Sequence, residues 1–132
     1  METLRSIAKR VLVVEDEPSI SHVCQRVLSA EGFAVDIAVN GKVAQNMIKM
    51  KQYDICLVDI RTPAMSGIEL YQWLKAENTG LEQGVIFTTG DVMREDVRGF
   101  LEHTDRPCLP KPFTPDELMS VIRQFLKSND NE

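Results

Sequence analysis

Short apolar runs alternate along the chain with longer stretches in which apolar residues recur at the spacing of a helix. The runs are Val11–Val14, Ala34–Val39, Ile55–Val58, Val85–Phe87 and Cys108–Leu109. Three of these runs are continuously apolar rather than alternating, which is typical of strands covered on both faces. The pattern therefore predicts five short strands, most of them buried.

Each apolar run is followed by a stretch that carries one apolar stripe at helical spacing. The stripes consist of Ile20, Val23, Cys24, Val27 and Leu28; Val43, Ala44, Met47 and Ile48; Leu70, Tyr71 and Leu74; Met93, Val97, Phe100 and Leu101; and Leu118, Val121, Ile122 and Phe125. Pro18 and the capping boxes that begin at Ser66 and Thr114 indicate helix starts, and Gly32 suits a left-handed helix end. These signals predict five helices, with Met47 and Met93 in the core.

Five strand–helix pairs in succession predict an α/β fold of the (βα)5 type. Right-handed crossovers place helices on both faces of a doubly wound, parallel, five-stranded sheet. In such sheets, ligands bind outside the carboxyl ends of the strands, at the point where the strand order reverses. The residues that follow each predicted strand are therefore the place to expect a functional site.

Length and charge narrow the class of protein. The 132 residues predict one domain, of which about six residues at each end, including the polar tail Ser128–Glu132, are expected to fray. Fifteen basic and twenty acidic residues give a net charge of −5, which argues against nucleic acid or an anionic membrane as a partner. No apolar run approaches the ~18 residues of a membrane span. Three cysteines without metal-ligand spacing indicate neither disulfides nor a zinc site, so we expect a soluble, cytoplasmic domain.

Polar and charged residues with possible chemistry follow four of the five predicted strands. They are Glu15, Asp16 and Glu17 after the first strand, Asp59 at the third, Thr88 and Thr89 at the fourth, and Lys111 after the fifth. If the first and third strands are neighbours, Glu15, Asp16 and Asp59 converge. Each close pair of carboxylates then costs roughly 1–4 kcal/mol, depending on the local dielectric.

A divalent cation would relieve this repulsion, and Mg²⁺ fits because it prefers a few carboxylate oxygens, several waters and a phosphate. A threonine hydroxyl and the ammonium of Lys111 would then hold the oxygens of a phosphoryl group. Asp59 would be the nucleophile, since carboxylates form aspartyl phosphates in some phosphotransfer proteins. The pattern favours phosphoryl chemistry at this edge of the sheet.

Each of these features alone also has an ordinary structural explanation. An acidic turn after a strand is often a solvated loop, and Asp59 alone would suit a helix cap or a turn. The two threonines are common strand residues, and Lys111 between two prolines would suit an exposed turn. Their joint occurrence at the carboxyl ends of successive core strands favours the functional interpretation.

The segments that carry these residues resemble the receiver domain of bacterial two-component response regulators. The matching segments are Val11–Pro18, Asp54–Asp59 with Pro63 and Gly67 after it, Val85–Gly90, and Lys111–Phe113. The likeness extends from about residue 9 to 127, so residues 1–132 are expected to form a single receiver domain. It also implies the strand order 2-1-3-4-5 of chemotaxis-type regulators.

The resemblance implies a role for each residue of the acidic set. Asp59 corresponds to the phosphoacceptor. Asp16 would bind Mg²⁺ directly, Glu15 would act largely through water, and the backbone carbonyl of Arg61 would supply another metal ligand. No other cofactor is implied.

The resemblance also implies roles at the fourth and fifth strands. Thr89 corresponds to the switch hydroxyl, rather than Thr88, because the small residue Gly90 follows it and leaves room for a phosphoryl group. Lys111 would pair with the phosphate. By the same likeness, the Lys111–Pro112 peptide bond is expected to be cis, although few X–Pro bonds are.

Three positions depart from the family pattern or leave a choice open. Cys108 stands where receivers usually carry Tyr or Phe, three residues before the lysine, so the usual coupling of threonine to an aromatic switch does not apply directly. Arg61 and Asp91 flank the phosphate site in the family, where they would tune the lifetime of the phosphoryl group. They suit solvated loop charges equally well.

The implied function is a switch rather than an enzyme acting on an external metabolite. A sensor histidine kinase or a histidine phosphotransfer protein would supply phospho-His, and Asp59 would accept the phosphoryl group in a Mg²⁺-dependent step. The face formed by the fourth helix, fifth strand and fifth helix would then bind a downstream protein. One alternative is a receiver-like binding module that works without phosphorylation, which Cys108 favours. Another is a flavin carrier or small enzyme, against which the lack of a glycine-rich phosphate loop after the first strand argues.

Overall fold

Five parallel strands form the centre of the computed structural model, which describes residues 9–130. The strands are β1 (Arg10–Val14), β2 (Ala34–Ala38), β3 (Ile55–Asp59), β4 (Val85–Thr89) and β5 (Cys108–Pro110). They pair in the order β2-β1-β3-β4-β5, and every pair is parallel. The expected strand order and doubly wound α/β fold are confirmed.

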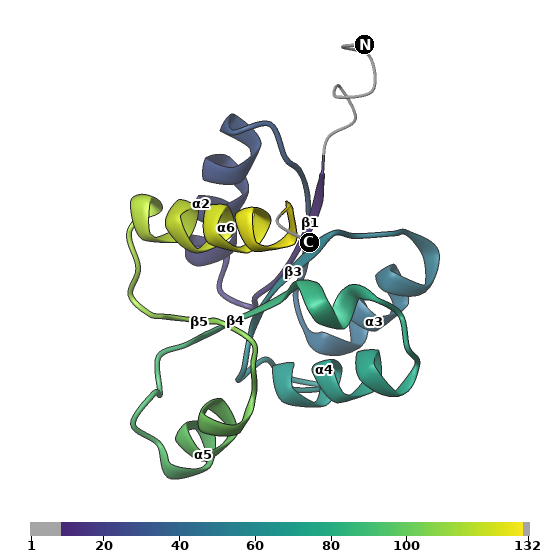
Figure 1. Cartoon of the computed structure of the whole chain (residues 1–132), viewed down its shortest axis with the longest axis vertical. Coiled ribbons are helices and arrows are strands. Elements are labelled where there is room, and N and C mark those ends of the chain that lie inside the picture. The colour runs from purple at the N-terminus through teal and green to yellow at the C-terminus, as the bar shows by residue number, and fades with distance from the viewer. Residues whose placement is uncertain (1–8, 131–132) are drawn as a thin grey trace.

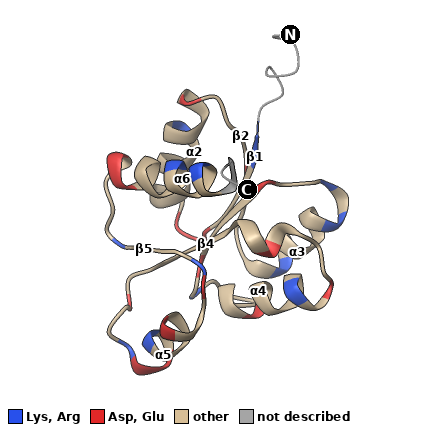
Figure 2. Cartoon of the chain, in the orientation of Figure 1, with Lys and Arg blue, Asp and Glu red and all other residues tan. Residues whose placement is uncertain are grey.

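Helices cover both faces of the sheet (Figure 1). They are α2 (Pro18–Ala30), α3 (Gly41–Met50), α4 (Gly67–Ala76), α5 (Glu95–His103) and α6 (Pro115–Asp130), with a short 3-10 helix, η1 (Leu81–Gly84), before β4. Helices α2 and α6 contact each other on one face, while α3, α4 and α5 lie on the other. Acidic and basic residues both occur on α4, α5 and α6 (Figure 2).

The sheet separates two apolar cores because successive strand side chains point to opposite faces. Val13, Leu57 and Ile86 pack with α2 and α6 in one core. In the other core, Val58 and Phe87 pack with α3, α4 and α5. Every residue of β3 and β4 is buried, as the continuous apolar runs predict.

The structure confirms the helix boundary signals. Helix α2 begins at Pro18, and Gly32, two residues past its end, has a φ of 99°, a conformation that residues with a Cβ rarely adopt. The Ser66 hydroxyl accepts a hydrogen bond from the backbone N–H of Glu69, whose carboxylate accepts one from the backbone N–H of Ser66. Thr114 and Glu117 make the same reciprocal pair. These caps fix where α4 and α6 leave the carboxyl edge of the sheet.

Four details differ from the sequence prediction. Met93 is 77% exposed rather than in the core, because α5 begins only at Glu95 and leaves Met93 in the preceding turn. Val43 is also exposed, at the edge of its stripe. The sequence pattern did not indicate η1. Helix α6 continues to residue 130, through part of the tail that we expected to fray, because no glycine or proline interrupts it. The rest of the ends expected to fray, residues 1–8 and 131–132, lies outside the described part of the chain.

Within residues 9–130, no helix has the length and apolar character needed to cross a bilayer.

Candidate functional site

Three carboxylates meet at the carboxyl ends of β1 and β3. These strands are neighbours, with Val14 paired to Val58, so Glu15 and Asp16 follow β1 directly beside Asp59 at the end of β3. One oxygen from each of the three carboxylates lies within 4.8 Å of the others. Glu15 and Asp59 are buried, whereas Asp16 is exposed to solvent. The predicted convergence of the acidic residues is confirmed.

Lys111 reaches into this cluster from the end of β5. Its Nζ lies 2.7 Å from Asp59 Oδ2 and 2.9 Å from Glu15 Oε1, and a third carboxylate, that of Glu17, lies 3.8 Å away. The Lys111 side chain is only 13% exposed. The lysine therefore balances part of a buried negative charge.

Burial and charge act against each other on two of these groups. Desolvation by burial raises the pKa of Glu15 above its ordinary value, assisted by the charge of Asp59 and opposed by the hydrogen bond from Lys111. Desolvation lowers the pKa of Lys111, but the hydrogen bonds and charges of Asp59 and Glu15 outweigh it and raise that pKa overall. Lys111 therefore stays protonated at neutral pH.

Backbone groups hold the carboxylates in place. Asp59 Oδ1 accepts a hydrogen bond of 3.0 Å from the backbone N–H of Arg61, and Glu15 Oε2 accepts one of 3.2 Å from that of Glu17. With Lys111 on the other oxygen of each, both buried carboxylates are bonded on both oxygens. This arrangement fixes their orientation toward the edge of the sheet.

Gly67 brings the start of α4 against the end of β3. A Cβ built at this position would lie 2.6 Å from the backbone oxygen of Asp59, so only glycine fits without a shift of the backbone. The N–H of Gly67 donates a hydrogen bond of 3.0 Å to the carbonyl of Ile60. Gly67 thus sets the position of the loop that carries Arg61.

Thr89 lies at the same edge but has a different partner. It ends β4, is fully buried, and its Oγ1 accepts a hydrogen bond of 3.0 Å from the backbone N–H of Asp91. Its carbonyl accepts one of 2.8 Å from the backbone N–H of Lys111. Thr88 pairs with Asp59 in the strand register. The structure therefore joins Thr89 to Lys111 through the backbone, with no direct hydrogen bond among the described residues from Thr89 to the acidic cluster.

Arg61 and Asp91 form an ion pair across the rim of the site, joining the loop after β3 to the loop after β4. Both side chains are about half exposed. Together with the backbone contacts above, this pair links Asp59 to Thr89 through Arg61 and Asp91. Sequence reasoning gave both residues a place beside the site but did not predict their pairing.

Glu17 is a neighbour of the site to which the sequence assigned no role. The sequence places Glu17 two residues after Glu15, but its approach to Lys111 depends on the turn into α2.

The expected cis peptide bond between Lys111 and Pro112 is present. Cys108 is half-buried at the start of β5 and pairs with Phe87.

The donor set is compatible with a divalent cation. Carboxylate oxygens are the ligands that hard divalent ions prefer, and the exposed Asp16 leaves one side of the cluster open to solvent. The backbone carbonyl of Arg61, the remaining expected ligand, stays a prediction.

Comparison with known proteins identifies relatives across nearly the whole chain. A family model described as the response regulator receiver domain matches residues 11–123. The transcriptional regulatory protein DltR of Streptococcus agalactiae is 36% identical over 114 residues, covering 86% of this chain and 50% of that protein. The DNA-binding response regulator MtrA of Mycolicibacterium smegmatis is 32% identical over 132 residues, covering all of this chain and 55% of that protein. This chain thus spans about half the length of these two relatives.

Solved structures show the same fold. The CheY-like response regulator receiver domain protein of Methanospirillum hungatei superposes with a TM-score of 0.83 at 26% identity, covering 95% of this chain and 98% of that one. The receiver domain of a signal transduction histidine kinase from Syntrophus aciditrophicus gives 0.81 at 27% identity, covering 92% of each chain. With the matched sequence segments and the acidic edge of the sheet, these likenesses show that the chain belongs to the response regulator receiver domain family.

Proposed function

We propose that the chain accepts a phosphoryl group on Asp59 from the phospho-His of a histidine kinase or a histidine phosphotransfer protein. The observation that carries this proposal is the position of Asp59. Its carboxylate is buried at the carboxyl edge of the sheet, within 2.7 Å of the Lys111 ammonium and beside two further carboxylates. Response regulator relatives support a histidine kinase as the partner.

The transfer exchanges one bond to phosphorus for another. An oxygen of Asp59 attacks the phosphorus, the P–N bond to the donor imidazole breaks, and the imidazole nitrogen keeps the electron pair and takes up a proton. The product on Asp59 is an acyl phosphate. The charge of Lys111 stabilises negative charge on the transferred group, and Thr89, whose backbone is bonded to Lys111, supplies a hydroxyl at the same edge.

Glu15, Asp16, Asp59 and the backbone carbonyl of Arg61 would hold Mg²⁺. When bound, the ion would neutralise the clustered carboxylates and the phosphoryl oxygens, so that an anionic acceptor and an anionic donor can approach. Arg61 and Asp91, joined across the rim, would tune how long the phosphoryl group lasts.

Phosphorylation at this edge would change the conformation of a protein-binding surface. The domain would not convert an external metabolite. Thr89 ends β4 and Lys111 directly follows β5, and these strands lead into α5 and α6. A change at the two side chains would therefore reach the face formed by α5, β5 and α6, where a downstream protein would bind. The domain assists its own phosphorylation and dephosphorylation only, and it works in the cytoplasm.

Acetyl phosphate labelling tests the proposal. With MgCl₂ we expect intact mass spectrometry to show one added phosphoryl group, and with EDTA we expect none. The Asp59→Asn variant should stay unlabelled, whereas Asp96→Asn, which changes an exposed carboxylate on α5, should be labelled like the parent. A label that persists in Asp59→Asn would refute the assignment.

Cys108, in place of the aromatic residue usual at this position, favours one competing function, a binding module that works without phosphorylation. In that case the affinity for a partner captured from the native organism would be the same with and without beryllofluoride and Mg²⁺. A change in affinity on adding beryllofluoride would exclude this alternative.

A further inference from the structure

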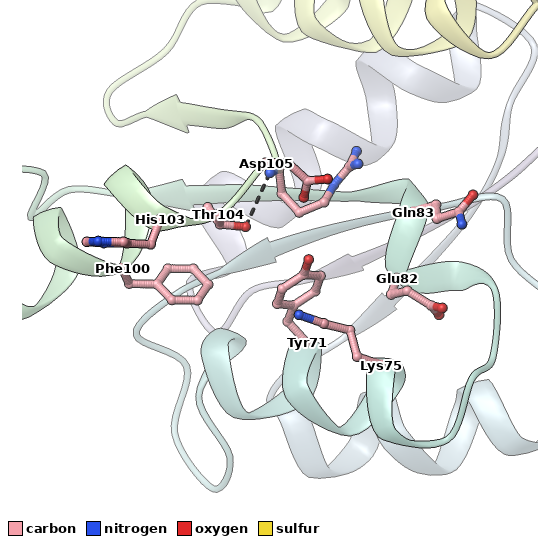
Figure 3. Close-up of a pocket in the computed structure, with 9 residues that line it drawn as sticks. Tyr71, Lys75, Glu82, Gln83, Phe100, His103, Thr104 and Asp105 are labelled. Atoms are coloured by element: carbon pink, nitrogen blue, oxygen red, sulfur yellow. Dashed lines mark hydrogen bonds between the residues drawn. The ribbon is translucent and has the colours of Figure 1, made fainter. Parts of the chain in front are cut away.

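A cavity lies at the end of the sheet opposite Asp59. It opens between the C-terminal half of α4, η1 and the connection from α5 to β5, beside the starts of β4 and β5 (Figure 3). Its volume is about 560 Å³, which falls within the roughly 300–1,000 Å³ typical of small-molecule sites. The phosphoacceptor proposal makes no use of this cavity.

Two aromatic rings form one wall of the cavity. Tyr71 comes from α4 and Phe100 from α5, and both pack edge to face against Phe87 of β4, with ring centroids 5.5 Å and 5.2 Å from it. The centroids of Tyr71 and Phe100 are themselves 6.3 Å apart, again edge to face. Because each ring is held by the other two, this wall is already formed without a ligand, and it suits a flat apolar group.

Two cations border the same space. The Lys75 ammonium lies 5.2 Å from the centroid of the Tyr71 ring, and Figure 3 shows the Lys75 side chain extending from α4 toward Tyr71. Arg106 is held in place by a hydrogen bond of 3.0 Å from its Nε to the carbonyl of Val85. Within the described part of the chain, neither cation forms an ion pair with a carboxylate.

Neither acidic residue of the lining forms an ion pair with these cations among residues 9–130. Glu82 Oε1 accepts hydrogen bonds from the Thr79 hydroxyl, at 3.0 Å, and from the backbone N–H of Gly80, at 2.7 Å. Its carboxylate therefore serves the turn before η1. Asp105 lies on the opposite side of the cavity from Lys75 (Figure 3), and its carboxylate would repel a second carboxylate.

From these contacts we propose that the cavity binds a small planar ligand that carries a carboxylate, with its ring against Tyr71 and Phe100 and its carboxylate between Lys75 and Arg106. Charge-assisted hydrogen bonds to a carboxylate are stronger than neutral ones, and an aromatic wall adds affinity for a flat ring. Neither contribution alone would select this class of ligand.

The test is an NMR titration of the isotope-labelled full chain with 2-naphthoate, with the uncharged 2-naphthamide as the matched probe. Saturable shifts should centre on the amides around Tyr71 and Phe100, and the amide probe should bind several-fold more weakly. We expect Lys75→Met to raise the dissociation constant of 2-naphthoate by about five- to tenfold. Asp105→Asn should lower it, because it removes a repelling charge.

Lys49→Met is the control for loss of a lysine beside an aromatic ring, because Lys49 lies 5.9 Å from the Trp73 centroid and outside the cavity lining. It should leave the dissociation constant unchanged. Equal binding of the two probes, equal effects of Lys75→Met and Lys49→Met, shifts centred elsewhere, or no saturable binding would each overturn the proposal. Because no phosphorylation is involved, these results are independent of the role of Asp59.

Discussion

Single residues show how tightly the acidic edge of the sheet is built. The Asp59 carboxylate has a bonded partner on each oxygen, the backbone N–H of Arg61 on one and Lys111 on the other. The same lysine also serves Glu15, so one cation is shared between two buried anions. Removing a partner from such a buried set leaves an uncompensated charge, so we expect substitutions of these partners to destabilise the fold.

Gly67 and Gly90 provide a matched pair of positions for alanine substitution. A Cβ at Gly67 would lie 2.6 Å from the Asp59 backbone oxygen, whereas one at Gly90 has nothing within 4 Å. We expect Gly67→Ala to destabilise the fold by about 1–3 kcal/mol through forced backbone shifts. Gly90→Ala should stay within about 0.5 kcal/mol of the parent. Urea unfolding followed by circular dichroism measures both, and equal midpoints for the two variants would contradict the close packing of α4 on β3.

Whole elements depend on side chains that join them. At the outer edge of the sheet, Tyr53 donates a hydrogen bond of 2.6 Å to Asp36 in β2, and Lys51 pairs with the same carboxylate at 3.0 Å. Strand β2 is thereby connected to the segment between α3 and β3. In contrast, Val97 is the one buried residue of α5, whereas α2, α3 and α4 each have three or four buried residues. Such an element is suited to move when the loop before it changes.

The Asp36 contacts predict a pH dependence of stability. The hydrogen bond from Tyr53 lowers the pKa of Asp36 below its ordinary value of 3.8, with Lys51 contributing, although burial opposes the shift. A lowered folded-state pKa stabilises the protein above the unfolded pKa, and this contribution is lost as the pH falls through the folded value. We therefore expect Asp36→Asn to be less stable than the parent at neutral pH and the gap to close below about pH 4. A gap that stays constant in urea unfolding from neutral pH to pH 3 would show that the carboxylate charge contributes nothing.

At the scale of the whole molecule, the sheet divides the interior into two cores that share every central strand. Cys24 lies in the core under α2 and α6, and Cys56 lies in the core on the opposite face. Burial raises the pKa of Cys24 to about 11 and that of Cys56 to about 12. Both thiols are therefore protonated and shielded in the folded state.

The two thiols report whether the cores unfold together. Near neutral pH we expect iodoacetamide to leave both unmodified in the native protein and to modify both over the same range of urea concentration, because small domains unfold as one unit. Mass spectrometry of the peptides measures each site separately. If Cys24 reacted at a clearly lower urea concentration than Cys56, the core under α2 and α6 would be an independent unit.

Local patterns were enough to predict most of this architecture. The buried strands, the Ser66 and Thr114 caps and the end of α2 near Gly32 depend on neighbours within a few residues, and the structure confirms them. The meeting of Glu15, Asp16 and Asp59 followed from the rule that parallel strands end at one edge.

Features that depend on distant residues were not predictable from local patterns. Met93 continued an apolar stripe, yet the chain turns there and α5 begins later. The Arg61–Asp91 ion pair and the hydrogen bond from Asp91 to Thr89 require two loops to approach each other. The cavity beside Tyr71 needs three separate segments, so no stretch of sequence contains its pattern.

Strand β4 has a further consequence for this molecule. Its first residue, Val85, binds Arg106 at the cavity, and its last, Thr89, binds the loop of Asp91 and the backbone of Lys111. At about 3.3 Å per residue, these contacts are roughly 13 Å apart on one extended segment. A displacement of the segment along its own axis would alter both ends at once. If a ligand bound at one end favours such a displacement, it changes the affinity for a ligand at the other end. The second ligand must then change the affinity for the first by the same factor.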